Sequence, residues 1–100
     1  MILNNDGATD EILEELILTW PVASGNLDDI TLGAQLLYDT VTPPTTIHLY
    51  EADWLGDQID RTIYTSSTEF LSFIFEGSIV SNGYTVTLTF ESGCVLSESH

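Results

Sequence analysis

The strongest constraint on the fold is a strict alternation of apolar and polar residues near the end of the sequence. From position 84 to position 91, Tyr, Val, Leu and Phe alternate with three threonines and a glutamate. Successive side chains of a strand point to opposite faces, so this pattern predicts a β-strand with one buried face. The other face carries Thr85, Thr87 and Thr89, and it is either exposed to solvent or covered by another chain.

Two other segments have the spacing of amphipathic helices. Between Thr9 and Trp20, apolar residues recur at positions 12, 13, 16, 17 and 20, which lie on one face of a helix that Pro21 would end. The segment Ser66–Glu69 has the spacing of a capping box and predicts a short, phenylalanine-rich helix that ends at Gly77.

The segment Leu27–Val41 fits two structures. Its apolar residues suit a helix that Asn26 would cap. Gly33 weakens that prediction, because glycine inside a helix costs about 1 kcal/mol relative to alanine. Residues 35–41 also alternate as a strand would. We favour the helix and leave the strand open.

An acidic stretch in the middle of the chain, Thr45–Thr65, predicts a β-hairpin. Apolar residues alternate with polar ones on both sides of an acidic loop, and Trp54 lies at the tip of that loop. Arg61, on the returning strand, is expected to act as a local counterion for the loop acids.

Together these elements follow the order ααββαβ. This order predicts an α+β fold: a small antiparallel sheet of three or four strands with two or three helices packed mainly on one face. One hundred residues, 43% of them hydrophobic, suit a single domain over residues 1–100. The mostly polar residues 92–100 are expected to fray.

The charge balance is the main indication of function. The chain has sixteen acidic residues, one arginine and no lysine, for a formal charge of -15, whereas small soluble domains usually carry a net charge of roughly 2 to 8 in magnitude. Such a surface repels nucleic acid and anionic membranes and favours cationic partners. Without a signal-peptide pattern or an apolar run of about 20 residues, and with a single cysteine, the protein is expected in the cytoplasm, that of the host cell if it is phage-encoded.

No group of residues predicts catalysis, a cofactor or a metal. Asp57 and Asp60 could form an acid and base pair, but among so many acids such pairs arise by chance. His48 has no second internal histidine beside it, and Cys94 has no neighbouring base, so a packed or surface imidazole and an inert thiol are favoured. Asp53, Asp57 and Asp60 are not spaced as the ligands of an EF-hand.

Two groups of acids are the candidate partner-binding residues. The polar face of the first predicted helix contributes Asp10, Glu11, Glu14 and Glu15. The predicted hairpin loop contributes Glu51, Asp53, Asp57 and Asp60. Carboxylates along a helix and a loop can approximate the charge density of double-stranded DNA, about one charge per 1.7 Å. Trp54 either anchors the partner or folds back over the sheet edge.

By its size and by these two groups of acids, the chain resembles, as a class, the small acidic proteins of phages and mobile elements that inhibit nucleic-acid enzymes. The class comprises DNA mimics, anti-CRISPR proteins and uracil-DNA glycosylase inhibitors, and its members share no motif. The resemblance implies a non-enzymatic inhibitor that binds the basic nucleic-acid-binding surface of a CRISPR effector or a DNA-processing enzyme. The alternatives are an oligomeric structural or adaptor protein of a phage virion, which would use the threonine face, and an immunity protein against a basic nuclease toxin.

Overall fold

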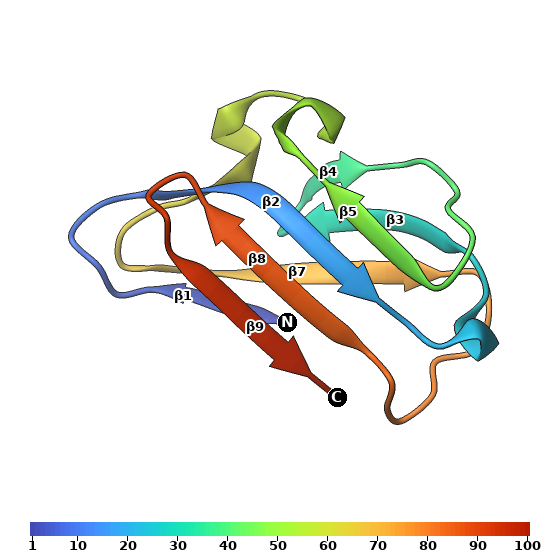
Figure 1. Cartoon of the computed structure of the whole chain (residues 1–100). Helices are drawn as coiled ribbons and strands as arrows, with labels where there is room; N and C mark the ends of the chain where they lie inside the picture. The colour runs from blue at the N-terminus through green and yellow to red at the C-terminus, as the bar shows by residue number, and fades with distance from the viewer.

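The computed structural model describes residues 1–100, and nearly all of its regular structure is β-strand. Two antiparallel sheets pack face to face (Figure 1). The first sheet has the order β1 (Ile2–Asn5), β7 (Ser67–Phe75), β3 (Leu27–Leu32), β4 (Gln35–Tyr38). The second sheet has the order β5 (Thr46–Leu49), β2 (Glu11–Thr19), β8 (Thr85–Phe90), β9 (Val95–Ser99), and β6 (Thr62–Ile63) also pairs with β2.

The predicted α+β fold is therefore wrong. The only helical segments are three short 3₁₀ turns, η1 (Val22–Ser24), η2 (Glu51–Asp53) and η3 (Gln58–Arg61). The chain passes back and forth between the two sheets, so most strands pair with partners that are distant in sequence. The spacing of residues within one segment does not show which distant strand it pairs with. The apolar spacings that resemble helices therefore led to a wrong prediction.

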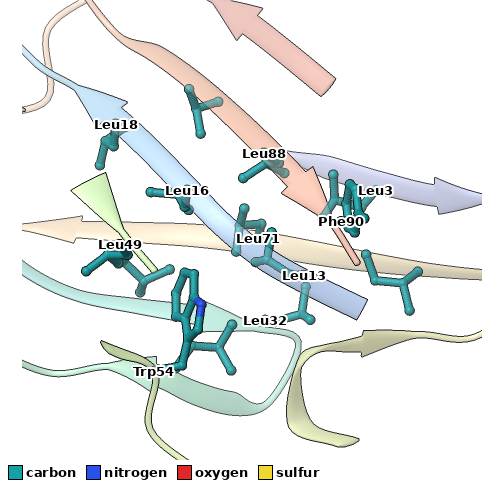
Figure 2. Packing of buried hydrophobic residues seen from close by; sticks show 14 of the residues in the cluster. Leu3, Leu13, Leu16, Leu18, Leu32, Leu49, Trp54, Leu71, Leu88 and Phe90 are labelled. Atoms are coloured by element: carbon teal, nitrogen blue, oxygen red, sulfur yellow. The ribbon is translucent and has the colours of Figure 1, made fainter. Parts of the chain in front are cut away.

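One hydrophobic core fills the space between the sheets. Sixteen buried hydrophobic residues, contributed by both sheets, form a single cluster. Figure 2 shows Leu16 and Leu88 of the second sheet near Leu71 of the first, with Trp54 at one side of the cluster. Because neither sheet could bury its apolar face alone, the two sheets depend on each other for stability.

The first predicted helix is strand β2. Leu13, Leu16, Leu18 and Trp20 are all buried, and the pairing of β2 with β8 shifts register between Leu13 and Glu15. This β-bulge adds one residue at Glu14, so the first two inward side chains are three positions apart instead of two. The bulge therefore produces a spacing that resembles one turn of a helix.

The two other predicted helices are strands as well. The segment Leu27–Val41 contains the β3–β4 hairpin, in which Gly33 has φ +58° at the turn. The strand alternative for residues 35–41 is therefore correct over Gln35–Tyr38. Ser67–Phe75 is β7, a central strand whose odd-numbered side chains face the core and whose even-numbered ones face outward. The alternation there is regular, but three phenylalanines and an isoleucine on both faces conceal it.

The strand predicted at residues 84–91 is confirmed as β8, with Val86, Leu88 and Phe90 buried. Residues 92–100 were expected to fray, but Val95–Ser99 pairs in continuous register with β8 as the edge strand β9. Backbone hydrogen bonds, rather than side-chain burial, hold this segment, since all five of its residues are exposed.

Candidate functional site

The predicted hairpin is an interrupted edge strand. β5 pairs with residues 16–19 of β2, β6 pairs with residues 11–12, and the two do not pair with each other. Both run antiparallel to β2, so residues 50–61 form a loop that leaves the strand and returns to it. We call residues 50–61 the acidic loop (top of Figure 1).

Two side chains of the acidic loop replace the ladder hydrogen bonds that the interruption removes. The Arg61 Nε donates to the carbonyl oxygen of Leu13 at 2.9 Å, and the Trp54 Nε1 donates to the carbonyl oxygen of Glu14 at 2.8 Å. A buried carbonyl without a partner is costly, so these donors compensate for the missing strand. The acidic loop is thereby held against the bulge of β2.

Trp54 consequently does not serve as an exposed anchor. Its side chain is only 7% exposed and belongs to the core cluster, beside Leu13, Leu32 and Leu49 in Figure 2. Of the two alternatives considered for this residue, folding back over the sheet edge is correct. The next residue, Leu55, joins the acidic loop to the first sheet, since its amide donates to the carbonyl oxygen of Leu37 in β4.

Two of the loop acids stabilise the loop itself. The Asp53 carboxylate accepts a hydrogen bond from the amide of Tyr50, and the Asp60 carboxylate accepts one from the amide of Asp57. Each acid occupies the third position of a 3₁₀ turn and bonds back to the residue before the turn, as the acid of a capping box does. Asp57 begins the second of these turns, and its carboxylate is exposed.

The four acids between Asp10 and Glu15 do not form one continuous surface. Asp10 accepts a hydrogen bond from the amide of Thr65, and Glu11 accepts one from the hydroxyl of Ser92, near the turn between β8 and β9. Glu14 and Glu15 lie at the bulge, where the acidic loop packs. Glu14 and Glu15 therefore lie beside the acidic loop, whereas the side chains of Asp10 and Glu11 bond to other segments.

Glu15 also takes part in an aromatic cluster on the outer face of the second sheet. The His48 Nε2 lies 3.6 Å from a carboxylate oxygen of Glu15, and the His48 Nδ1 lies 3.1 Å from the Tyr50 hydroxyl. The rings of His48 and Tyr50 stack with centroids 4.1 Å apart. Sequence reasoning missed the link between Glu15 and His48, because it depends on the pairing of β2 with β5.

Beside the acidic loop is a hollow that combines acidic and apolar side chains. It has a volume of about 400 Å³ and lies between η3 and the β3–β4 turn. Asp60 and Glu69 line it together with Ile59 and Tyr64, which are 65% and 46% exposed. Ile59 and Tyr64 are therefore exposed hydrophobic side chains beside carboxylates, which is the position that the sequence suggested for Trp54.

A third acidic group lies on the first sheet and was not predicted. Burial, followed by the nearby carboxylates of Asp28 and Asp39, raises the pKa of Asp29 above its ordinary value. One Asp29 carboxylate oxygen is buried without a hydrogen-bond partner. This acidic group arises from the pairing of β3 with β4. The register that sets Ile30 opposite Tyr38 brings Asp29 and Asp39 close to each other.

The fold leaves almost no positive charge on the surface. Arg61 is only 4% exposed, and one of its terminal nitrogens lies 3.9 Å from Glu51. The N-terminal ammonium group donates to the carbonyl oxygen of Leu71. Since the chain has no lysine and no second arginine, the side chains that reach solvent are anionic or neutral, apart from two histidines.

Comparison of the chain with protein-family models, curated proteins and solved structures gives no match. None of its helical turns is long and apolar enough to cross a membrane. No three carboxylate, imidazole or thiol groups are placed where they could share a metal ion.

Proposed function

We propose that this protein is a non-enzymatic acidic inhibitor that binds the basic nucleic-acid-binding surface of another protein, in the manner of a DNA mimic. A CRISPR effector or a DNA-processing enzyme would present such a surface. The observation that carries the proposal is the burial of Arg61, the only arginine in a chain without lysine. Because this cation is enclosed and pairs only with Glu51, the other carboxylates of the surface have no arginine or lysine beside them to neutralise their charge.

The acidic loop and the β2 bulge form the contact surface of this proposal. It comprises Glu14, Glu15, Glu51 and Asp57, with the hollow beside them adding Asp60 and Glu69. Arginine and lysine side chains that normally hold phosphates would pair with these carboxylates. Ile59 and Tyr64 would supply the apolar contact that charge pairs alone lack.

The loop is also well suited to binding because it is ordered before the partner arrives. The side-chain bonds of Trp54 and Arg61 hold it to β2, and Asp53 and Asp60 fix its two turns. Ordering a flexible loop on association costs binding free energy, which a preformed loop largely avoids. Long-range attraction between the anionic surface and a cationic one would speed association at low salt.

The test is capture of partners from a cell lysate on the immobilised chain, with elution by rising salt and identification of the eluted proteins. Nucleic-acid-binding proteins should elute with salt and should be displaced by added double-stranded DNA. The variant carrying Glu14→Lys and Asp57→Lys should capture far less of them, because both substitutions reverse a charge of the contact surface while the backbone groups of these residues keep their bonds to Trp54 and Asp60. Failure of DNA to displace any captured protein would refute the proposal.

A matched control is the Glu76→Lys variant, whose charge lies just after β7, at the end of that strand opposite to Glu69 and the hollow beside the acidic loop. It should capture the same proteins as the unmodified chain, after allowance for its smaller net charge. Equal loss of capture in this control and in the Glu14→Lys, Asp57→Lys variant would show that only total charge matters and that the acidic loop is not the contact surface.

A structural or adaptor role is the second candidate, and one feature favours it. The outer face of β8 and β9 is uncharged and rich in hydroxyls, with Thr85, Thr87, Thr89, Ser97 and Ser99 side by side in register. On a chain of charge -15, this neutral face is where copies could pack with the least repulsion. Light scattering distinguishes the two roles, since a closed oligomer insensitive to salt supports the structural one.

A further inference from the structure

Two hollows lie in line along one open side of the sandwich, between strands β1 and β9. The larger has a volume of about 350 Å³, and Met1 and Leu71 face Val86 and Glu98 across it. The smaller has a volume of about 240 Å³, and Leu3 faces Phe90 and Leu96 across it. Met1 and Leu3 are alternate residues at one wall, and Leu96 and Glu98 are alternate residues at the other. The two hollows follow each other along the same pair of strands, and we call them together the β1/β9 slot.

The strand along this slot has a free backbone edge. His100 and Tyr84 exchange both backbone hydrogen bonds, and the continuous register then places Glu98 and Leu96 in the positions that bond to β8. The amides and carbonyls of Val95, Ser97 and Ser99 consequently point away from β8, where no strand follows.

Apart from the charge of Glu98, this edge lacks the usual protections. Strand β9 contains no proline, lysine or bulge, and its exposed residues include Val95 and Leu96. At the opposite edge of the same sheet, by contrast, β5 is short and the acidic loop follows it directly. An unprotected edge beside an apolar slot is the arrangement that proteins use to bind an extended peptide by strand addition.

We propose that the β1/β9 slot binds an extended segment of a partner protein, which adds to β9 as a further strand of the second sheet. The charges at the slot specify the partner's chemistry. Glu98 lines one hollow, and Asp6 and Glu11 line the other, so carboxylates flank an apolar centre. The complementary segment has alternating apolar side chains flanked by lysine or arginine.

A second copy of this chain fits the slot less well. Pairing two β9 strands would bring two chains of charge -15 together and place Glu98 of each near carboxylates of the other. A cationic segment gains from the same field that repels a second copy. This site is separate from the acidic loop, so it extends the proposed function without depending on it.

The test uses a library of random peptides displayed on filamentous phage, selected on the whole chain and counter-selected on the Ser97→Pro variant. The amide of Ser97 faces away from β8, so proline there leaves the β8–β9 ladder intact and blocks only the added strand. Enriched peptides should alternate apolar residues with others and carry lysine or arginine. No enrichment over the counter-selection, or enrichment of acidic peptides, would overturn the proposal.

The matched control is Ser97→Ala, which removes the same hydroxyl, together with its bond to Thr87, but keeps the amide. In fluorescence anisotropy an enriched peptide should bind the alanine variant as it binds the unmodified chain, and the proline variant about tenfold or more weakly. Glu98→Lys should also weaken binding, whereas Glu14→Lys with Asp57→Lys should leave it nearly unchanged. Equal binding by the alanine and proline variants contradicts strand addition.

A second measurement covers the case in which the proline variant does not fold. Bound peptide should slow hydrogen exchange at the amides of Val95, Ser97 and Ser99 in the unmodified chain, and unchanged exchange there would overturn the proposal. If the chain alone is a dimer that protects these amides by itself, the occupant is a second copy and the proposal fails.

Discussion

Arg61→Met tests whether the buried arginine stabilises the fold mainly through the carbonyl of Leu13. The substitution keeps an apolar side chain of similar length but removes the Nε donor, which lies 2.9 Å from an oxygen of a residue that is 0% exposed. A buried carbonyl left without its partner costs about 1–3 kcal/mol. The ion pair with Glu51 adds little, because it spans 3.9 Å and Glu51 is 56% exposed, and exposed pairs contribute about 0–1 kcal/mol.

We therefore expect the free energy of unfolding to fall by about 2 kcal/mol. For a domain of this size, that corresponds to a decrease in Tm of about 8–16 °C. Urea denaturation followed by tryptophan fluorescence gives the free energy, and thermal denaturation followed by circular dichroism gives the Tm. The matched control is Glu51→Gln, which removes the ion pair alone and should cost less than about 1 kcal/mol.

Two results would refute this reasoning. If Glu51→Gln destabilises the protein as much as Arg61→Met, the ion pair is the main contribution and the arginine acts as the counterion that the sequence suggested. If Arg61→Met leaves stability unchanged, the carbonyl of Leu13 finds another donor, and the side chain does not replace the missing strand.

Three further predictions follow from the same structure. Trp54→Phe, which removes the indole donor to Glu14, should lower the free energy of unfolding by about 1–3 kcal/mol and speed amide exchange in the acidic loop; uniform exchange across the chain would contradict the role given to Trp54. Leu88→Ala, at a fully buried position of β8, should cost about 2–5 kcal/mol in urea denaturation, whereas Thr87→Ala on the outer face should cost much less. Asp29→Asn should stabilise the protein at neutral pH, because a raised pKa means that the folded state disfavours the charged carboxylate. That gain should disappear as the pH falls through the raised pKa toward the ordinary value, and a gain that persists in acid would exclude this cause.

The acidic surface was predictable from composition alone, but its distribution was not. Asp53 and Asp60 are separated from their bonding partners by only three residues, so the capping turns of the loop are local features that the sequence contains. The position of Glu14 and Glu15 beside the loop, and the bonds of Asp10 and Glu11 to other segments, depend on which strands pair with β2.

The sequence by itself determined the charge and the β8 strand, because each depends on residue type or on neighbours a few positions away. Only the tertiary structure decided that residues 11–19 are a strand. The bulge at Glu14 gives them a helical spacing, and their pairing partners β5, β6 and β8 lie far along the chain. Tertiary structure likewise decided that the side chains of Arg61 and Trp54 are buried against β2. Only the interruption of an edge strand creates the unpaired carbonyls to which they donate.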